Sequence, residues 1–211
     1  MASKGKKKYW KQWEAFSEYL KNGERPDTFE TAYAVVCDKV SGLYESEARA
    51  MWNNIRAINP KSIVEIGRNL GGSQFLFCCA AQELEIFNSF DIEAFELTDE
   101  WLEEWGCFNG INTNNMVSDS TQLGGKIGIV YDLVFIDGGH TGPIVKADIE
   151  IWKDHCRYIC FHDYADDNGR NKHKKYYPDV VEQIRGAAQA YQWQQFGERG
   201  RSDVCFRTGV K

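Results

Sequence analysis

Two stretches decide the fold of this chain, Ser62-Ile-Val-Glu-Ile-Gly67 and Tyr131-Asp-Leu-Val-Phe-Ile-Asp-Gly138. Each is a short, mainly apolar run that ends in glycine, which is typical of strands buried on both faces of a parallel sheet. A helical pattern follows each of them, over Ser73–Leu84 and Pro143–His155. Strands that alternate with helices form βαβ units, so these stretches predict an α/β fold.

The same alternation continues on both sides of these stretches. We expect further strands over Ile86–Ile92, Asn115–Asp119 and Arg157–Tyr164. Helices are expected over Asp99–Trp105 and Pro178–Ala190. Near the C-terminus, Gln192–Phe196 and Asp203–Arg207 flank GERGRS and predict an antiparallel hairpin. The sequence thus predicts a doubly wound, mostly parallel sheet with helices on both faces.

The first part of the chain has helical patterns only. Large apolar residues recur there at spacings of three and four, namely Trp10, Trp13, Phe16 and Leu20, and they predict a first helix. A second helix is expected over Ser46–Ala57, with Ser46 as its N-cap. We therefore divide the chain into a helical extension, residues 1–60, and an α/β domain, residues 61–211. The extension could be a lid or a dimerisation element, and homo-oligomers are left open.

Composition and charge exclude several classes of protein. Hydrophobic residues make up 43% of the 211 residues, enough for a packed core. No apolar run approaches the roughly 20 residues that span a bilayer, so we expect no membrane partner. The net charge of -6 argues against general nucleic-acid binding. Two basic runs, within residues 4–8 and 170–175, are interpreted as solvated segments, with contact to an anionic substrate or partner as the alternative.

The seven cysteines are odd in number and form no CxxC pair. We therefore expect neither a disulfide framework nor a zinc knuckle, and a cytoplasmic location fits best. Cys78 and Cys79 lie in an apolar helical run, where cysteine behaves as a small core residue.

Polar residues collect at the carboxyl ends of the predicted strands, where open α/β sheets bind ligands. The first strand leads into a glycine-rich turn, where backbone can approach a ligand closely. The later strands end near Asp91, near Asp119 and Ser120, and near Asp137. The turn reads G-x-x-x-G-G, unlike the G-x-G-x-x-G of dinucleotide-binding loops. A carboxylate at Glu65 would repel phosphate but attract a cationic amino ligand, which favours S-adenosylmethionine over NAD.

A metal site is expected where the fourth and fifth strands end. Asp137 follows one strand, His162 and Asp163 end the other, and neighbouring strands lie about 4.8 Å apart. Two carboxylates and an imidazole suit Mg²⁺ or Mn²⁺, with Zn²⁺ or Fe²⁺ as alternatives. Hydrogen-bonded strand caps are the other interpretation. His140 could take a hydroxyl proton as general base.

Several motifs of this chain resemble those of a known family. They are Val64-Glu-Ile-Gly67 with Gly71-Gly72-Ser73, then Phe135-Ile-Asp-Gly-Gly-His140, Val145-Lys-Ala-Asp148 and Phe161-His-Asp-Tyr164. They are similar to the small class I S-adenosylmethionine-dependent methyltransferases grouped with macrocin-type and sugar O-methyltransferases, over about residues 45–210. The resemblance implies a seven-stranded sheet and O-methylation of a hydroxyl on a sugar or natural product, often with a divalent ion. It places the cofactor against Glu65, Gly67, Gly71, Gly72, Ser73, Asp91 and Asp119, with Ser120 beside them. It also assigns the ion to Asp137, His162 and Asp163, and the role of base to His140.

Two features depart from the family pattern. Arg68-Asn69 is a bulky, polar start to the glycine loop, and the charged stretch 165–177 has no counterpart. Two rival functions remain open. Asp137, His140 and His162 could form the site of a metal-centred oxygenase or hydrolase, or the chain could bind S-adenosylmethionine without catalysis.

Overall fold

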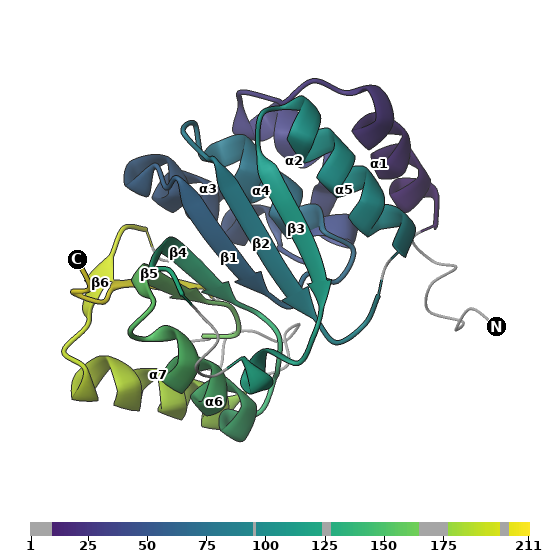
Figure 1. Cartoon of the computed structure of the whole chain (residues 1–211). Helices are drawn as coiled ribbons and strands as arrows, with labels where there is room; N and C mark the ends of the chain where they lie inside the picture. The colour runs from purple at the N-terminus through teal and green to yellow at the C-terminus, as the bar shows by residue number, and fades with distance from the viewer. Residues whose placement is uncertain (1–9, 95, 124–127, 165–176, 199–202) are drawn as a thin grey trace.

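The computed structural model of the chain describes residues 10–94, 96–123, 128–164, 177–198 and 203–211. Seven strands form one sheet in the order β3-β2-β1-β4-β5-β7-β6 (Figure 1). The strands are β1 Ser62–Ile66, β2 Ile86–Asp91, β3 Asn112–Val117, β4 Tyr131–Ile136, β5 Cys156–Phe161, β6 Gln194–Phe196 and β7 Val204–Arg207. Strands β1 to β5 pair in parallel, and β7 pairs antiparallel with both β5 and β6. The predicted doubly wound sheet and its C-terminal hairpin are confirmed.

Helices cover both faces of the sheet. Helices α6 and α7 lie on one face, and the remaining helices are on the other side (Figure 1). The helices are α1 Trp10–Asn22, α2 Phe29–Ser41, α3 Glu45–Ile58, α4 Gly72–Ala80, α5 Glu96–Phe108, α6 Gly142–Trp152 and α7 Pro178–Ala190. A 3₁₀ turn, η2 at Ser120–Gln122, follows β3.

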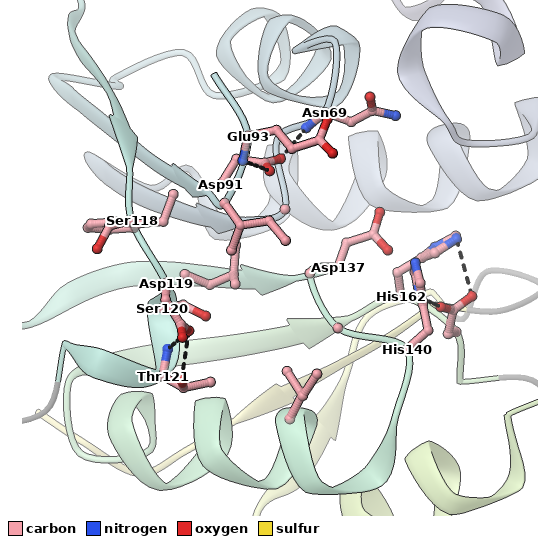
Figure 2. Close-up of a pocket in the computed structure, with 18 of the residues that line it drawn as sticks. Asn69, Asp91, Glu93, Ser118, Asp119, Ser120, Thr121, Asp137, His140 and His162 are labelled. Carbon is pink, nitrogen blue, oxygen red and sulfur yellow. Dashed lines mark hydrogen bonds and ion pairs between the residues drawn. The ribbon is translucent and has the colours of Figure 1, made fainter. Parts of the chain in front are cut away.

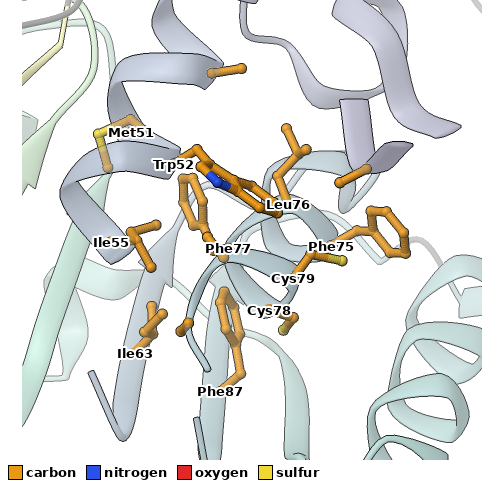
Figure 3. Packing of buried hydrophobic residues seen from close by; sticks show 14 of the residues in the cluster. Met51, Trp52, Ile55, Ile63, Phe75, Leu76, Phe77, Cys78, Cys79 and Phe87 are labelled. Carbon is orange, nitrogen blue, oxygen red and sulfur yellow. The ribbon is translucent and has the colours of Figure 1, made fainter. Parts of the chain in front are cut away.

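Alternate residues of the central strands supply two hydrophobic clusters, one on each side of the sheet. Ile63 of β1 belongs to the cluster beneath α1 to α5, whereas Val64 belongs to the one beneath α6 and α7. In the first cluster, Phe75 and Phe77 of α4 pack between the sheet and the N-terminal helices (Figure 3). The prediction that Cys78 and Cys79 are core residues is confirmed, because both are buried there.

The N-terminal helices pack directly on the layer that carries the glycine loop. Phe16 of α1 and Met51 of α3 share the first cluster with the sheet. The backbone of Val40, at the C-terminus of α2, lies close to Gly72. A Cβ added to Gly72 would be 2.5 Å from the carbonyl oxygen of Val40. The predicted cap of α3 is wrong: the helix begins at Glu45, with Tyr44 as N-cap. The boundary at residue 60 and the lid role stay predictions.

One covalent contact in the fold was not predicted. Cys160 of β5 and Cys205 of β7 are opposite each other in register and form a disulfide. Cysteine counting missed this pair because the two residues are 45 positions apart and meet only through strand pairing.

None of the helices in the described part of the chain is both long and apolar enough to span a membrane. Both basic runs, within 4–8 and 170–175, lie outside the described residues.

Candidate active site

A pocket of about 640 Å³ opens at the carboxyl edge of the sheet. The loops after β1, β2, β3, β4 and β5 form its walls, as expected at the edge where the strand order reverses (Figure 2). Its volume is within the range of sites that enclose small molecules. Most of the residues predicted for the site line it, namely Gly67, Asp91, Asp119, Ser120, Asp137, His140, His162 and Asp163.

Asp91 joins the end of β2 to the glycine loop. Its Oδ2 accepts the backbone N–H of Asn69 at 2.8 Å, and its Oδ1 accepts that of Glu93 at 3.0 Å (Figure 2). Asn69 has a φ of 48°, a left-handed conformation that asparagine tolerates better than most residues. Each carboxylate oxygen has a second lone pair. Asp91 can therefore hold the loop and still accept hydrogen bonds from a ligand.

Gly67 and Arg68 explain the unusual start of the glycine loop. Gly67 has a φ of 89°, and a Cβ there would lie 2.4 Å from the carbonyl oxygen of Asp137. Arg68 is buried and turns away from the pocket. Its guanidinium donates two hydrogen bonds of 2.7 Å to Asp99 of α5 and one of 2.9 Å to Ser89 of β2. Arg68 therefore anchors the loop from below and does not obstruct the pocket.

Glu65 is fully buried beneath the same loop. The Ser73 hydroxyl donates to its Oε1 at 2.5 Å, and among the described residues its Oε2 has no hydrogen-bond partner. Burial raises the pKa of Glu65 to about 8, so the group is mostly protonated at neutral pH. Glu65, Gly71, Gly72 and Ser73 do not line the pocket. The expectation of a charged carboxylate facing the ligand thus has no support in this geometry.

The loop after β3 is fixed by two acidic residues. Asp119 caps η2 by accepting the N–H of Thr121 at 2.9 Å and its hydroxyl at 2.6 Å, and these bonds lower the pKa of Asp119. The hydroxyl of Ser120 donates to Oδ1 of Asp148 on α6 at 2.6 Å. Burial raises the pKa of Asp148 to about 6. Ser120 therefore both lines the pocket and ties the loop to α6.

The ends of β4 and β5 bring together three groups that could hold a metal ion. One ligand atom each from Asp137, His140 and Asp163 lies within 4.8 Å of the others. The Nδ1 of His140 is 2.5 Å from Oδ2 of Asp163, and this hydrogen bond raises the pKa of His140. Burial raises the pKa of Asp137 to about 6. The ring of His140 stacks on Tyr177 at a centroid distance of 5.2 Å.

His162 lies beside this group, at the end of β5 (Figure 2). Its Nδ1 is 2.6 Å from Oδ1 of Asp203, and its Nε2 is 3.7 Å from Oδ1 of Asp163. The predicted ion ligands and the three-residue group thus share Asp137 and Asp163 and differ in the histidine. Sequence reasoning missed Tyr177 and Asp203, because neither belongs to a motif and both reach the site only through tertiary packing.

Comparison with known proteins supports the fold. Residues 64–164 match the family model described as a methyltransferase domain. In sequence, the chain has no significant match among curated proteins. Among solved structures, a putative caffeoyl-CoA O-methyltransferase from Staphylococcus aureus is 14% identical, with a TM-score of 0.57 and coverage of 96% of each chain.

Two further structures have the same fold. A TDP-rhamnose 3'-O-methyltransferase of calicheamicin biosynthesis is 14% identical, with a TM-score of 0.59 over 99% of this chain and 96% of that one. An S-adenosylhomocysteine-bound methyltransferase from Podospora anserina is 13% identical, with a TM-score of 0.57 over 99% and 97%. Residues 64–164 therefore carry a methyltransferase domain, and the chain as a whole has the class I methyltransferase fold.

Proposed function

We propose that this enzyme transfers the methyl group of S-adenosylmethionine to a hydroxyl of a small molecule, such as a sugar or a natural product, with a divalent ion. The observation that carries the proposal is the pairing of His140 with Asp163 on the wall of the pocket. A carboxylate only accepts hydrogen bonds, so Nδ1 of His140 carries the proton. Nε2 is then the nitrogen available as a base.

The cofactor would occupy the part of the pocket between the ends of β1 and β3. Asp91 would accept hydrogen bonds from the ribose hydroxyls, and Gly67 lets backbone approach the amino-acid part. Asp119 and Ser120 would line the side of the adenine. Glu65, Gly71, Gly72 and Ser73 would shape the glycine loop from beneath. S-adenosylmethionine supplies, when bound, the electrophilic methyl group.

The donor set fits a divalent ion. Carboxylate oxygens of Asp137 and Asp163 with one imidazole are ligands that Mg²⁺ and Mn²⁺ accept. We assign the imidazole to His162, because its Nε2 faces Asp163 while its Nδ1 is already held. A bound ion would lower the pKa of an acceptor hydroxyl. Asp163 has a φ of 61°, a strained conformation of the kind that clusters at functional sites.

His140 would perform the proton transfer. Its Nε2 would take the proton of the acceptor hydroxyl, and the oxygen of that hydroxyl is the atom to be methylated. Asp163 holds the ring and stabilises the imidazolium that forms, while Tyr177 packs against the ring face. The main contribution of the chain is positioning of the reactants.

Calorimetric titration with S-adenosylmethionine and S-adenosylhomocysteine, with and without Mg²⁺, tests the cofactor site first. We expect micromolar binding that is lost in Asp91→Ala. A panel of hydroxyl acceptors with labelled S-adenosylmethionine then tests turnover. His140→Ala should abolish transfer and leave cofactor affinity near that of the wild type, and His155→Ala, outside the pocket, is the matched control.

The other outcomes point to other functions. No cofactor binding under any metal condition would remove the proposal, and activity that needs Fe²⁺ and a co-oxidant would favour an oxygenase. Cofactor binding with no transfer to any acceptor would favour a non-catalytic subunit. Transfer that survives in His140→Ala would show that another group is the base.

A further inference from the structure

Asp203 is a buried acidic residue beside the candidate active site. It immediately precedes β7, and only 1% of its surface is exposed. Its Oδ1 lies 2.6 Å from Nδ1 of His162. Because the burial of a carboxylate is costly unless hydrogen bonds compensate, its place in the structure depends on partners such as this imidazole.

The pairing of β5 with β7 sets the position of Asp203. Cys160 is opposite Cys205 and Phe161 is opposite Val204, so the same register continues to His162 opposite Asp203. The disulfide between Cys160 and Cys205 joins these strands on the same face, two residues from the pair.

The hairpin that carries Asp203 is also held from α3. The side chain of Asn54 donates to the carbonyl oxygen of Glu198 at 2.7 Å and accepts the backbone N–H of Glu198 at 2.7 Å. Asn54 is itself buried. The strand that follows Asp203 is thus joined to β5 by pairing and a disulfide, and the turn after β6 is bound to α3.

We propose that Asp203 is a positioning residue of the active site, which holds the Nδ1–H of His162 so that Nε2 faces Asp163 and the pocket. A carboxylate accepts only, so the hydrogen bond requires the proton on Nδ1. The remaining nitrogen is 3.7 Å from Oδ1 of Asp163, and the ring lines the pocket. Histidines that bind metal are commonly oriented in this way by a carboxylate on the other nitrogen.

The expected effect on metal affinity rests on the proposed role of His162 as an ion ligand. The expected tautomer of His162 does not depend on that role. A purely structural Asp203 would make the same hydrogen bond, but its removal would leave the Mn²⁺ affinity of the folded protein unchanged. The protonation of the ring and the metal affinity are therefore both measured. The chain has four histidines, so nitrogen NMR can resolve each ring.

The test is ¹⁵N NMR of the imidazoles in wild type, Asp203→Asn and Asp203→Ala, with His162→Gln for assignment. At alkaline pH, where the ring is neutral, we expect His162 of the wild type with its proton on Nδ1 and a lone pair on Nε2. In Asp203→Ala, Nε2 should become protonated in a substantial part of the population. Asp132→Asn is the matched control, because it alters a structural carboxylate at the opposite end of β4 that accepts from Ser62 and Arg157.

Titration with Mn²⁺ alone gives a second readout. Loss of an orienting partner typically weakens metal affinity about 10- to 100-fold, and we expect that loss in folded Asp203→Asn and none in Asp132→Asn. A wild type that binds no Mn²⁺ but shows the expected tautomer would refute the ion and retain Asp203 as the positioning residue. A neutral wild-type ring that carries its proton on Nε2, or a tautomer unchanged in both Asp203 variants, would overturn the proposal.

Discussion

Replacing Glu65 with glutamine should stabilise the protein increasingly as the pH rises. Glu65 is fully buried, and its Oε2 has no hydrogen-bond partner among the described residues. Burial raises the pKa of this carboxyl from 4.5 to about 8 in the folded chain. The unfolded chain releases the proton near the ordinary value, so the folded state holds a proton that the unfolded state has lost between these two values.

The sign and size follow from proton linkage. Where the folded state binds more protons, the free energy of unfolding falls as the pH rises. Each pKa unit corresponds to about 1.4 kcal/mol, so the difference between 4.5 and about 8 amounts to at most about 5 kcal/mol. The loss begins near pH 4.5 and is complete above about pH 8. Because glutamine does not ionise, Glu65→Gln does not undergo this loss of stability.

Urea unfolding of both proteins at about pH 5, 7 and 9 measures this difference through the denaturation midpoint. We expect the advantage of Glu65→Gln over the wild type to grow by several kcal/mol across the series. Glu83→Gln, which removes an exposed carboxylate, is the control and should show no such growth. An advantage that is constant with pH, or one that shrinks toward alkaline pH, would refute the argument that Glu65 is buried without charge.

Three further substitutions test the support of the pocket. Asp99→Ala leaves the buried guanidinium of Arg68 without its carboxylate and should cost about 3–5 kcal/mol in urea unfolding; a loss below 1 kcal/mol, typical of exposed pairs, would contradict this. Gly67→Ala places a methyl group 2.4 Å from the carbonyl oxygen of Asp137, so both thermal stability and S-adenosylmethionine affinity should fall, and an unchanged affinity would count against the loop geometry. Asn54→Ala removes two hydrogen bonds to the turn after β6. We expect the free energy of unfolding to fall by about 1–3 kcal/mol and proteolysis of that turn to become faster; an unchanged rate of proteolysis would show that Asn54 does not hold the turn.

The order of the elements could be read from the sequence, because short apolar runs and helical periodicity are local patterns. The runs that begin at Ser62 and Tyr131 are the two neighbouring central strands of the sheet, as their composition predicts. Individual boundaries were less accurate. Helix α4 ends at Ala80, where Leu84 was expected, and β3 begins at Asn112, where Asn115 was expected, since a few residues at an end depend on packing.

The location of the site was also predictable, because parallel strands present their carboxyl ends at one edge. Asp91, Asp137 and His140 all line the pocket for this reason. The direction of each side chain was not predictable. Arg68 follows the strand like a pocket residue, yet its guanidinium pairs with Asp99 on α5, which lies 31 positions away. A motif specifies the position of a residue along the chain and not which face of the loop it occupies.

By itself, the sequence determined the α/β class, the strand edge that carries the site and the acidic and imidazole groups found there, because these depend on local patterns and strand direction. Only the tertiary structure decided which groups meet. His140 pairs with Asp163, His162 with Asp203, and Cys160 with Cys205. Each pair joins residues from different elements, at 23, 41 and 45 positions apart. Such contacts depend on strand register and on burial, which act across the whole fold.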